Sequence, residues 1–248
     1  MIRILNFDDS VTRQKGLLSL YNPEIIDLTD IAPRVRFWLN KKDREEIKRR
    51  IGASEGRAVT FLGSGDFHQV SEILISGFCE PMTLIDFDFH PDRSIVAPCY
   101  CCGSWARTAI RRGSVGKYVQ AGTKRGAVKN AQDFKDAVKS IPSGKVYVTI
   151  DKDCLTKDHA LTNWHEGKME LEELLSMLKF VKENFRIAGV DITGEYSPVR
   201  IDGMVKRAIA YLDRPRDFSA RGVPESRIDA VNEETNLKIL EILTQARS

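Results

Sequence analysis

The stretch DFDFHPD at residues 86–92 alternates acidic or imidazole side chains with aromatic rings and a proline. Side chains of a β-strand point to opposite faces in turn, so a strand here would separate the polar residues from Phe87, Phe89 and Pro91. The residues on the polar side would be Asp86, Asp88, His90 and Asp92. Burying several carboxylates together is unfavourable unless a cation or another partner compensates for their charge. The stretch therefore predicts a cation site.

Short β-rich runs alternate with helical runs on both sides of this stretch. We expect strands at 2–7, 58–63, 82–88, 117–122, 145–151 and 186–192, and helices at 70–78, 131–141, 169–185, 202–212 and 230–246. In the helix at 169–185, for example, leucines recur at helical spacing. Alternating strands and helices are typical of an α/β fold with a mostly parallel sheet covered on both faces.

Composition and length narrow the class of protein. The chain has 248 residues, of which 42% are hydrophobic, and lacks an obvious proline or glycine linker, so we expect a single domain over residues 1–248. Its 38 basic and 35 acidic residues give a net charge of +3, which argues against nucleic acid as a partner. The N-terminus lacks a signal-peptide pattern and no apolar run reaches the ~20 residues of a membrane span, so we expect a soluble, cytoplasmic protein with reduced cysteines.

Acidic and histidine residues follow four of the predicted strands. GSGDFH at 63–68 supplies Asp66 and His68, DKD at 151–153 supplies Asp151 and Asp153, and DITGEYSP at 191–198 supplies Asp191 and Glu195. The fourth segment is DFDFHPD. Sites in open parallel sheets form beyond the carboxyl ends of the strands, so these side chains are expected to converge.

The type of ligand indicates the metal. A mixture of about four carboxylates and two imidazoles suits Mn²⁺ or Fe²⁺ better than a thiolate zinc site. Two such ions would be neutralised by four carboxylates, and they could share a water molecule and lower its pKa to generate a hydroxide nucleophile. A single ion would leave too many acids uncompensated.

The segments GSGDFH, DFHPD and TIDKD, in this order, resemble the three metal motifs of the arginase, agmatinase and formiminoglutamase group, the ureohydrolases. DITGEYSP resembles the substrate-side glutamate segment of that family, and the similarity spans roughly residues 57–212. The resemblance implies a three-layer α/β/α fold with two Mn²⁺ ions. It implies that His68 and Asp92 hold one ion, His90 and Asp153 hold the other, and Asp88 and Asp151 bridge both. Glu195 would orient the substrate's guanidinium or amidine group.

The sequence also departs from the family pattern. Phe67 separates Asp66 from His68, and one extra residue separates Asp191 from Glu195. No histidine occurs from Pro91 to Asp158, so the proton-shuttling loop histidine of arginase and agmatinase has no counterpart.

Other residues are candidates for the missing roles. His159 and His165 could replace the proton shuttle, although both could equally be structural or surface residues. Trp105 and Trp164 could line a substrate pocket or simply pack. Asp66, Asp86 and Asp191 are expected to orient the metal ligands.

These features predict a binuclear metal hydrolase of a linear C–N bond, acting on a guanidino, amidino or related amide group of a small molecule or a peptide. The catalytic candidates are Asp88, Glu195, His165 and His159. A single-zinc, deacetylase-like amide hydrolase and a non-catalytic binding protein that keeps the fold are the alternatives, and metal content would separate the three. The oligomeric state is left open, although ureohydrolases often form trimers or hexamers.

Overall fold

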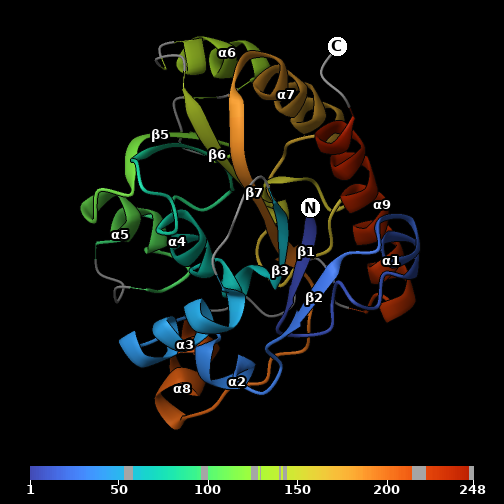
Figure 1. Ribbon diagram of the computed structural model, residues 1–248. Coiled ribbons are helices and arrows are strands. Elements are labelled where there is room, and N and C mark those ends of the chain that lie inside the picture. Colours follow the sequence, from blue (N-terminus) through green and yellow to red (C-terminus); the bar gives the residue numbers. More distant parts are fainter. Residues whose placement is uncertain are drawn as a thin grey trace.

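The computed structural model of the protein describes residues 1–52, 58–95, 100–123, 128, 130–139, 141, 144–213 and 222–245. Its centre is a seven-stranded sheet with the order β2-β1-β3-β7-β6-β4-β5, in which every neighbouring pair is parallel (Figure 1). The strands are β1 (Ile2–Asn6), β2 (Glu24–Asp27), β3 (Val59–Ser64), β4 (Met82–Phe87), β5 (Val115–Ala121), β6 (Lys145–Asp151) and β7 (Arg186–Glu195). The predicted α/β class with a parallel sheet is confirmed.

The central strands are buried on both faces because their sequences are almost continuously apolar up to the polar end. All residues of β3 are buried, as are all but the first residue of β6. The six strands expected from sequence are present. Strand β2 was missed because its sequence, EIID, lies at the edge of the sheet and is mostly exposed.

Helices cover both faces of the sheet (Figure 1). On one face, α1 (Lys15–Tyr21), α6 (Ala131–Lys139), α7 (Leu171–Asn184) and α9 (Glu225–Thr244) bury a hydrophobic cluster that includes Leu17, Phe134, Leu174 and Ile239. On the other face, α2 (Ala32–Val35), α3 (Lys41–Ile51), α4 (Val70–Ile75) and α5 (Trp105–Arg111) bury a second cluster that includes Val35, Ile47, Ile73 and Ala106. The helix α8 (Met204–Asp213) follows β7.

The predicted helix at 131–141 includes residue 140 and the one at 230–246 ends at residue 246, and both of these residues lie outside the described part of the chain. None of the helices in the described part of the chain is long and apolar enough to cross a membrane.

The strand order brings the four polar strand ends together. Strands β3, β7, β6 and β4 are consecutive neighbours at the centre of the sheet. Short 3₁₀ turns follow two of them, η1 (Gly65–Phe67) after β3 and η2 (Lys152–Cys154) after β6. In β7, Gly194 has a φ of +86° and a Cβ atom there would lie 2.4 Å from Oδ1 of Asp151. Only glycine fits at this point, so the Asp151 carboxylate occupies the space that a side chain would otherwise fill.

Candidate metal centre

His68 is one of two histidines around which the carboxylates gather. Its Nδ1 atom lies 3.0 Å from Oδ2 of Asp92, 3.4 Å from Oδ2 of Asp88 and 3.5 Å from Oδ2 of Asp151. The turn η1 places His68 directly after β3, and all four side chains are at most 5% exposed. A buried imidazole nitrogen facing three carboxylates is a suitable donor set for a hard or borderline divalent cation.

The second group of ligands surrounds His90. Nδ1 of His90 lies 2.7 Å from Oδ2 of Asp153 and 3.8 Å from Oδ1 of Asp88. The backbone N–H of Phe89 donates to the other oxygen of Asp153 at 3.1 Å, which fixes the carboxylate. The side chain of His90 is 34% exposed, whereas those of Asp88 and Asp153 are 1% exposed. This side of the centre therefore opens toward solvent.

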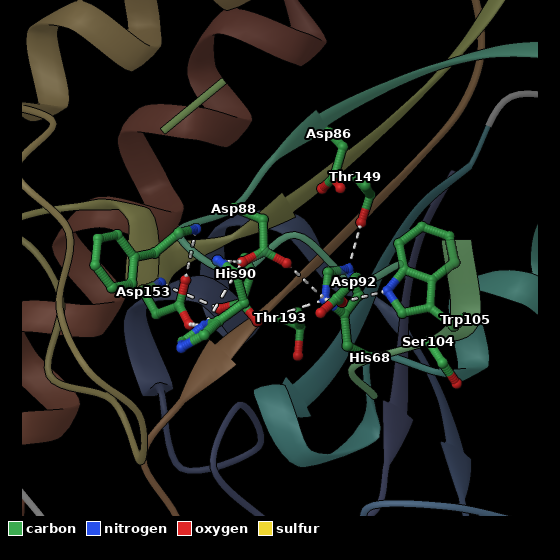
Figure 2. Close-up of polar contacts among 12 residues, drawn as sticks. His68, Asp86, Asp88, His90, Asp92, Ser104, Trp105, Thr149, Asp153 and Thr193 are labelled. Carbon is green, nitrogen blue, oxygen red and sulfur yellow. Dashed lines mark hydrogen bonds and ion pairs between the residues drawn. The ribbon is translucent and has the colours of Figure 1, made fainter. Parts of the chain in front are cut away.

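Asp88 belongs to both groups (Figure 2). Its Oδ2 faces His68 and its Oδ1 faces His90, and Figure 2 shows His90 and Asp153 on one side of Asp88 and His68 and Asp92 on the other. Oδ2 is buried and has no hydrogen-bond partner. One carboxylate with its two oxygens directed at two donor groups suits a bridging ligand between two cations.

Asp86 approaches the His68 group more closely than sequence analysis indicated. Ligand atoms of His68, Asp86 and Asp88 all lie within 4.8 Å of one another. Tyr118 donates to Oδ2 of Asp86 at 2.6 Å, but the buried Oδ1 has no partner. Asp86 is therefore a candidate ligand as well as an orienting residue, and its alternation with Asp88 in DFDFHPD was the sequence signal. Strand β4 ends at Phe87, so the strand predicted to run on through Asp92 does not continue that far.

A chain of hydrogen bonds supports the His68 ring. Thr149 donates from Oγ1 to Oδ1 of Asp191 at 2.5 Å, and the same Oγ1 lies 2.9 Å from Nε2 of His68. Because the hydroxyl proton is used by Asp191, Nε2–H of His68 donates to Thr149 and Nδ1 keeps its lone pair for a cation. Asp191 thus acts on His68 through Thr149, in the orienting position expected for it.

The indole of Trp105 supports Asp92 in a similar way. Trp105 is fully buried in α5, and its Nε1–H donates to Oδ2 of Asp92 at 2.5 Å. The ring lies 4.8 Å from the His68 ring, measured between centroids. This contact gives Trp105 a role in holding Asp92, and its contact with substrate stays a prediction.

The electrostatics show how strongly the centre favours positive charge. Burial would lower the pKa of His68, but the neighbouring carboxylates of Asp88 and Asp92 outweigh burial and hold that pKa well above its usual value. Burial raises the pKa of the Asp86 carboxyl to about 7 and that of Asp151 to about 8. Burial opposes the shift at His90, where Asp153 raises the pKa to about 9. Without metal, the centre retains protons to offset the repulsion among its carboxylates.

Trp164 lies on the His90 side of the centre. Its ring is 5.6 Å from that of His90 and 6.2 Å from that of Phe37. Its Nε1–H donates to Oδ1 of Asp66 at 2.9 Å, and the other Asp66 oxygen accepts from Nε of Arg36 at 2.6 Å. A buried ion pair therefore fixes the orientation of Trp164.

The structure does not group Glu195 with these side chains. Its carboxylate accepts hydrogen bonds from Lys152, Asn236 and Gln14, and the pair formed with Lys152 is buried. A contact between Glu195 and a guanidinium group stays a prediction.

The two candidate proton shuttles lie in different surroundings. Nε2 of His159 pairs with Oε2 of Glu170 at 3.0 Å, and His159 packs near α9, where Thr235 donates to its carbonyl oxygen. His165 is exposed and follows Trp164 directly in the chain. Of the two, His165 is nearer in sequence to the aromatic side of the centre.

The donor set fits two divalent cations. It combines two imidazole nitrogens with buried carboxylates, arranged as two groups that share Asp88, and two of its carboxylate oxygens are buried without partners. Buried carboxylates without a partner are unfavourable unless a cation is present. Asp92 and Asp151 lie beside His68, Asp153 lies beside His90, and Asp88 faces both histidines.

Comparison with known sequences finds one relative of unassigned function. No family model matches the chain. An uncharacterized protein of Thermotoga maritima is 31% identical over 203 residues, which cover 80% of this chain and 81% of that protein.

Three solved structures illustrate the similarity of fold. A putative agmatinase from Clostridium difficile has a TM-score of 0.62 at 16% identity, covering 98% of this chain and 95% of that one. Formimidoylglutamase from Bacillus subtilis has a TM-score of 0.58 at 15% identity, covering 95% and 86%. Arginase from Medicago truncatula has a TM-score of 0.56 at 15% identity, covering 98% and 85%. The three-layer arrangement expected from the sequence motifs is confirmed.

Proposed function

We propose that the chain is a divergent member of the ureohydrolase superfamily and that it is a binuclear metal-dependent hydrolase, a proposal supported by the shared fold. Its reaction would cleave a linear C–N bond in a guanidino, amidino or related amide group. The observation that carries the proposal is the pair of donor groups that share Asp88. The ions would be Mn²⁺ or Fe²⁺, since carboxylates and imidazoles favour these metals.

The metal site would be divided between its two histidines. His68 and Asp92 would hold one ion, His90 and Asp153 the other, and Asp88 with Asp151 would bridge them. When bound, two such ions supply Lewis acidity and lower the pKa of a water molecule between them. In the reaction the water oxygen bonds to the substrate carbon, the C–N bond breaks, and the departing nitrogen takes a proton.

The protein's own residues would keep this centre in shape. Thr149 and Asp191 would hold the His68 ring in the tautomer whose Nδ1 lone pair is available to a cation among the carboxylates. Trp105 holds Asp92. Substrate would approach from the side of His90, the partly exposed histidine, along the ring of Trp164. His165 is the proposed proton donor to the leaving nitrogen, by way of solvent or directly.

Metal analysis tests this proposal first. The protein is purified from cells grown with and without added manganese, metal per chain is measured by elemental analysis, and release of urea, ammonia or amine is assayed with guanidino, amidino and amide compounds. About two manganese or iron atoms per chain together with metal-dependent turnover would support it. One zinc per chain would indicate a deacetylase-like hydrolase instead. No bound metal under either condition would indicate a binding protein.

A further inference from the structure

Both oxygens of the Glu195 carboxylate are already engaged inside the protein. Oε1 accepts from Nζ of Lys152 at 2.5 Å and from Nδ2 of Asn236 at 2.7 Å, and Oε2 accepts from Nε2 of Gln14 at 3.1 Å. The side chains of Lys152 and Glu195 are 0% and 2% exposed. A lysine ammonium therefore occupies the position in which Glu195 would receive a cationic substrate group.

The carboxylate also faces away from the His68 side of the sheet. Asn236 lies in α9 and Gln14 precedes α1, and these helices cover one face of the sheet. Asp191, on the same strand, bonds instead to Thr149, which reaches His68. The bulge at Gly194 separates the two acids. A substrate cation would have to displace Lys152 to reach Glu195, leaving a buried ammonium without a partner, which is strongly unfavourable.

The other acids around the centre are assigned to the metal-capable groups or to an ion pair, and Asp86 belongs to the group of His68 and Asp88. Asp88, Asp92, Asp151 and Asp153 belong to the metal-capable groups, and Asp66 is paired with Arg36. The first residue after Asp92 is itself an arginine, and the exposed Arg93 guanidinium lies 4.8 Å over the ring of Tyr118. The fixed charges that flank the metal-capable groups therefore do not favour a positively charged substrate.

Aromatic rings flank the exposed histidine. Centroids of Phe37 and Trp164 lie 6.2 Å apart, those of Trp164 and His90 5.6 Å, and those of His90 and Phe89 5.3 Å. Because Asp66 and Arg36 fix the Trp164 ring, the partly exposed rings of Trp164 and Phe89 are held beside His90, on the side from which substrate would approach, and Phe37 is buried next to Trp164. Such surfaces suit a flat, uncharged molecule, which packs against rings at little cost in desolvation.

We propose that the group hydrolysed is uncharged and planar, a ureido or carboxamide group on an aromatic or apolar carrier, and that protonated guanidino compounds are poor substrates. The inference rests on the proposed hydrolase function and narrows its substrate class. For an aryl urea, the water oxygen bonds to the carbonyl carbon, the bond to the aryl-bearing nitrogen breaks, and that nitrogen takes a proton. The products are the arylamine and carbamic acid, which decomposes to ammonia and carbon dioxide.

Charge-matched substrate pairs test the proposal. Phenylurea and phenylguanidine have the same shape and differ in charge at neutral pH, as do benzamide and benzamidine. Ammonia and amine release by the manganese-loaded full-length protein gives kcat/KM for all four. We expect kcat/KM for the neutral member of each pair to exceed that for the cationic member by about 10-fold or more. Equal or faster turnover of the cationic members would overturn the proposal.

Binding measurements separate this proposal from the hydrolase function. Dissociation constants for the same four compounds are measured by calorimetry on the metal-loaded protein. Neutral compounds that bind more tightly but are not cleaved would support the substrate class and count against the hydrolase function. Tighter binding of the cations, or binding of none of the four, would overturn the substrate class even if another compound were hydrolysed.

A variant of Trp164 tests the aromatic row. Trp164→Leu is expected to raise KM for the neutral aryl compounds by about 10-fold because it removes the aromatic contact, with metal content unchanged. The matched control is Trp38→Leu, because Trp38 contacts Lys206 rather than His90. Equal effects of the two substitutions on KM would count against the role of Trp164.

Discussion

The indole Nε1–H of Trp105 donates to Oδ2 of Asp92 at 2.5 Å, and the same oxygen lies 3.0 Å from Nδ1 of His68. Asp92 therefore lies between two side chains. One is the fully buried, uncharged indole of Trp105, and the other is the imidazole of His68, which would bind the same ion. The contact fixes the rotamer of this proposed ligand, which lies in the segment between β4 and α5. It connects the metal centre to the core on the α4 and α5 side of the sheet.

Trp105→Phe should lower the affinity for manganese while causing a smaller loss in the free energy of unfolding. Phenylalanine keeps an aromatic ring in the core but removes the donor to Asp92, and loss of such outer contacts typically lowers metal affinity by about 10–100-fold. Manganese affinity is measured by competition with a chelating dye, and the free energy of unfolding by denaturant titration. Trp38→Phe serves as the control, because its ring contacts Lys206. Unchanged manganese affinity in Trp105→Phe would contradict the assigned role.

Asp88→Asn should remove both ions, because the carboxylate is common to the two donor groups. Asp151→Asn is expected to do the same if it bridges as proposed. Elemental analysis of the purified variants should find less than one metal atom per chain, and hydrolytic activity should fall below detection. Asp136→Asn, an exposed change on α6, is the control for the loss of one carboxylate. If either variant retained two metal atoms per chain, the carboxylate replaced in that variant would not be a bridging ligand.

The buried pair of Lys152 and Glu195 should behave as a unit. Lys152→Met and Glu195→Gln each leave one partner uncompensated, and breaking such a pair costs about 3–5 kcal/mol of folding free energy. The double variant removes both charges and should recover much of that loss. Chemical denaturation of the three variants gives the coupling energy between the residues. Strictly additive losses would mean that the pair contributes no interaction of its own.

Much of the fold could be predicted because the central strands are apolar runs that end abruptly in acids. In β3, β4 and β6 the apolar residues predict burial and the following aspartates and histidines predict the site. The order β3-β7-β6-β4 could not be read from the chain, since crossovers between parallel strands do not specify which strands become neighbours. Edge strand β2 escaped prediction because half of its residues are acidic and its side chains are mostly exposed.

Individual roles within the site were harder to predict than its location. Trp105 lies 13 residues after Asp92, and nothing in the sequence connects an indole N–H with a carboxylate at that separation. Glu195 gave a readable signal, since one extra residue separates it from Asp191; Gly194 forms a bulge there, and the side chain joins Lys152 on the other face. The pairing of Lys152 with Glu195 was not predicted from the sequence.

The metal-free protein should lose stability as the pH rises, and metal should suppress that loss. The pKa values of Asp86, Asp151 and His90 in the folded protein are raised to about 7, 8 and 9. At any pH between the ordinary pKa of one of these groups and its raised pKa, the folded form therefore binds more protons than the unfolded form. The stabilisation that accompanies these protons is present at low pH and disappears as the pH passes through the raised values.

The measurement is the melting temperature, Tm, from pH 5 to pH 9 in EDTA and in excess manganese. In EDTA, Tm should fall steadily across this range, by about 2–4 °C for each 1 kcal/mol lost in a domain of this size. With manganese, the ions replace the protons and also stabilise the folded state by binding to it, so Tm should be higher at pH 8 and depend less on pH. If Tm depended on pH in the same way in EDTA and in manganese, metal would not be what offsets the repulsion among these carboxylates.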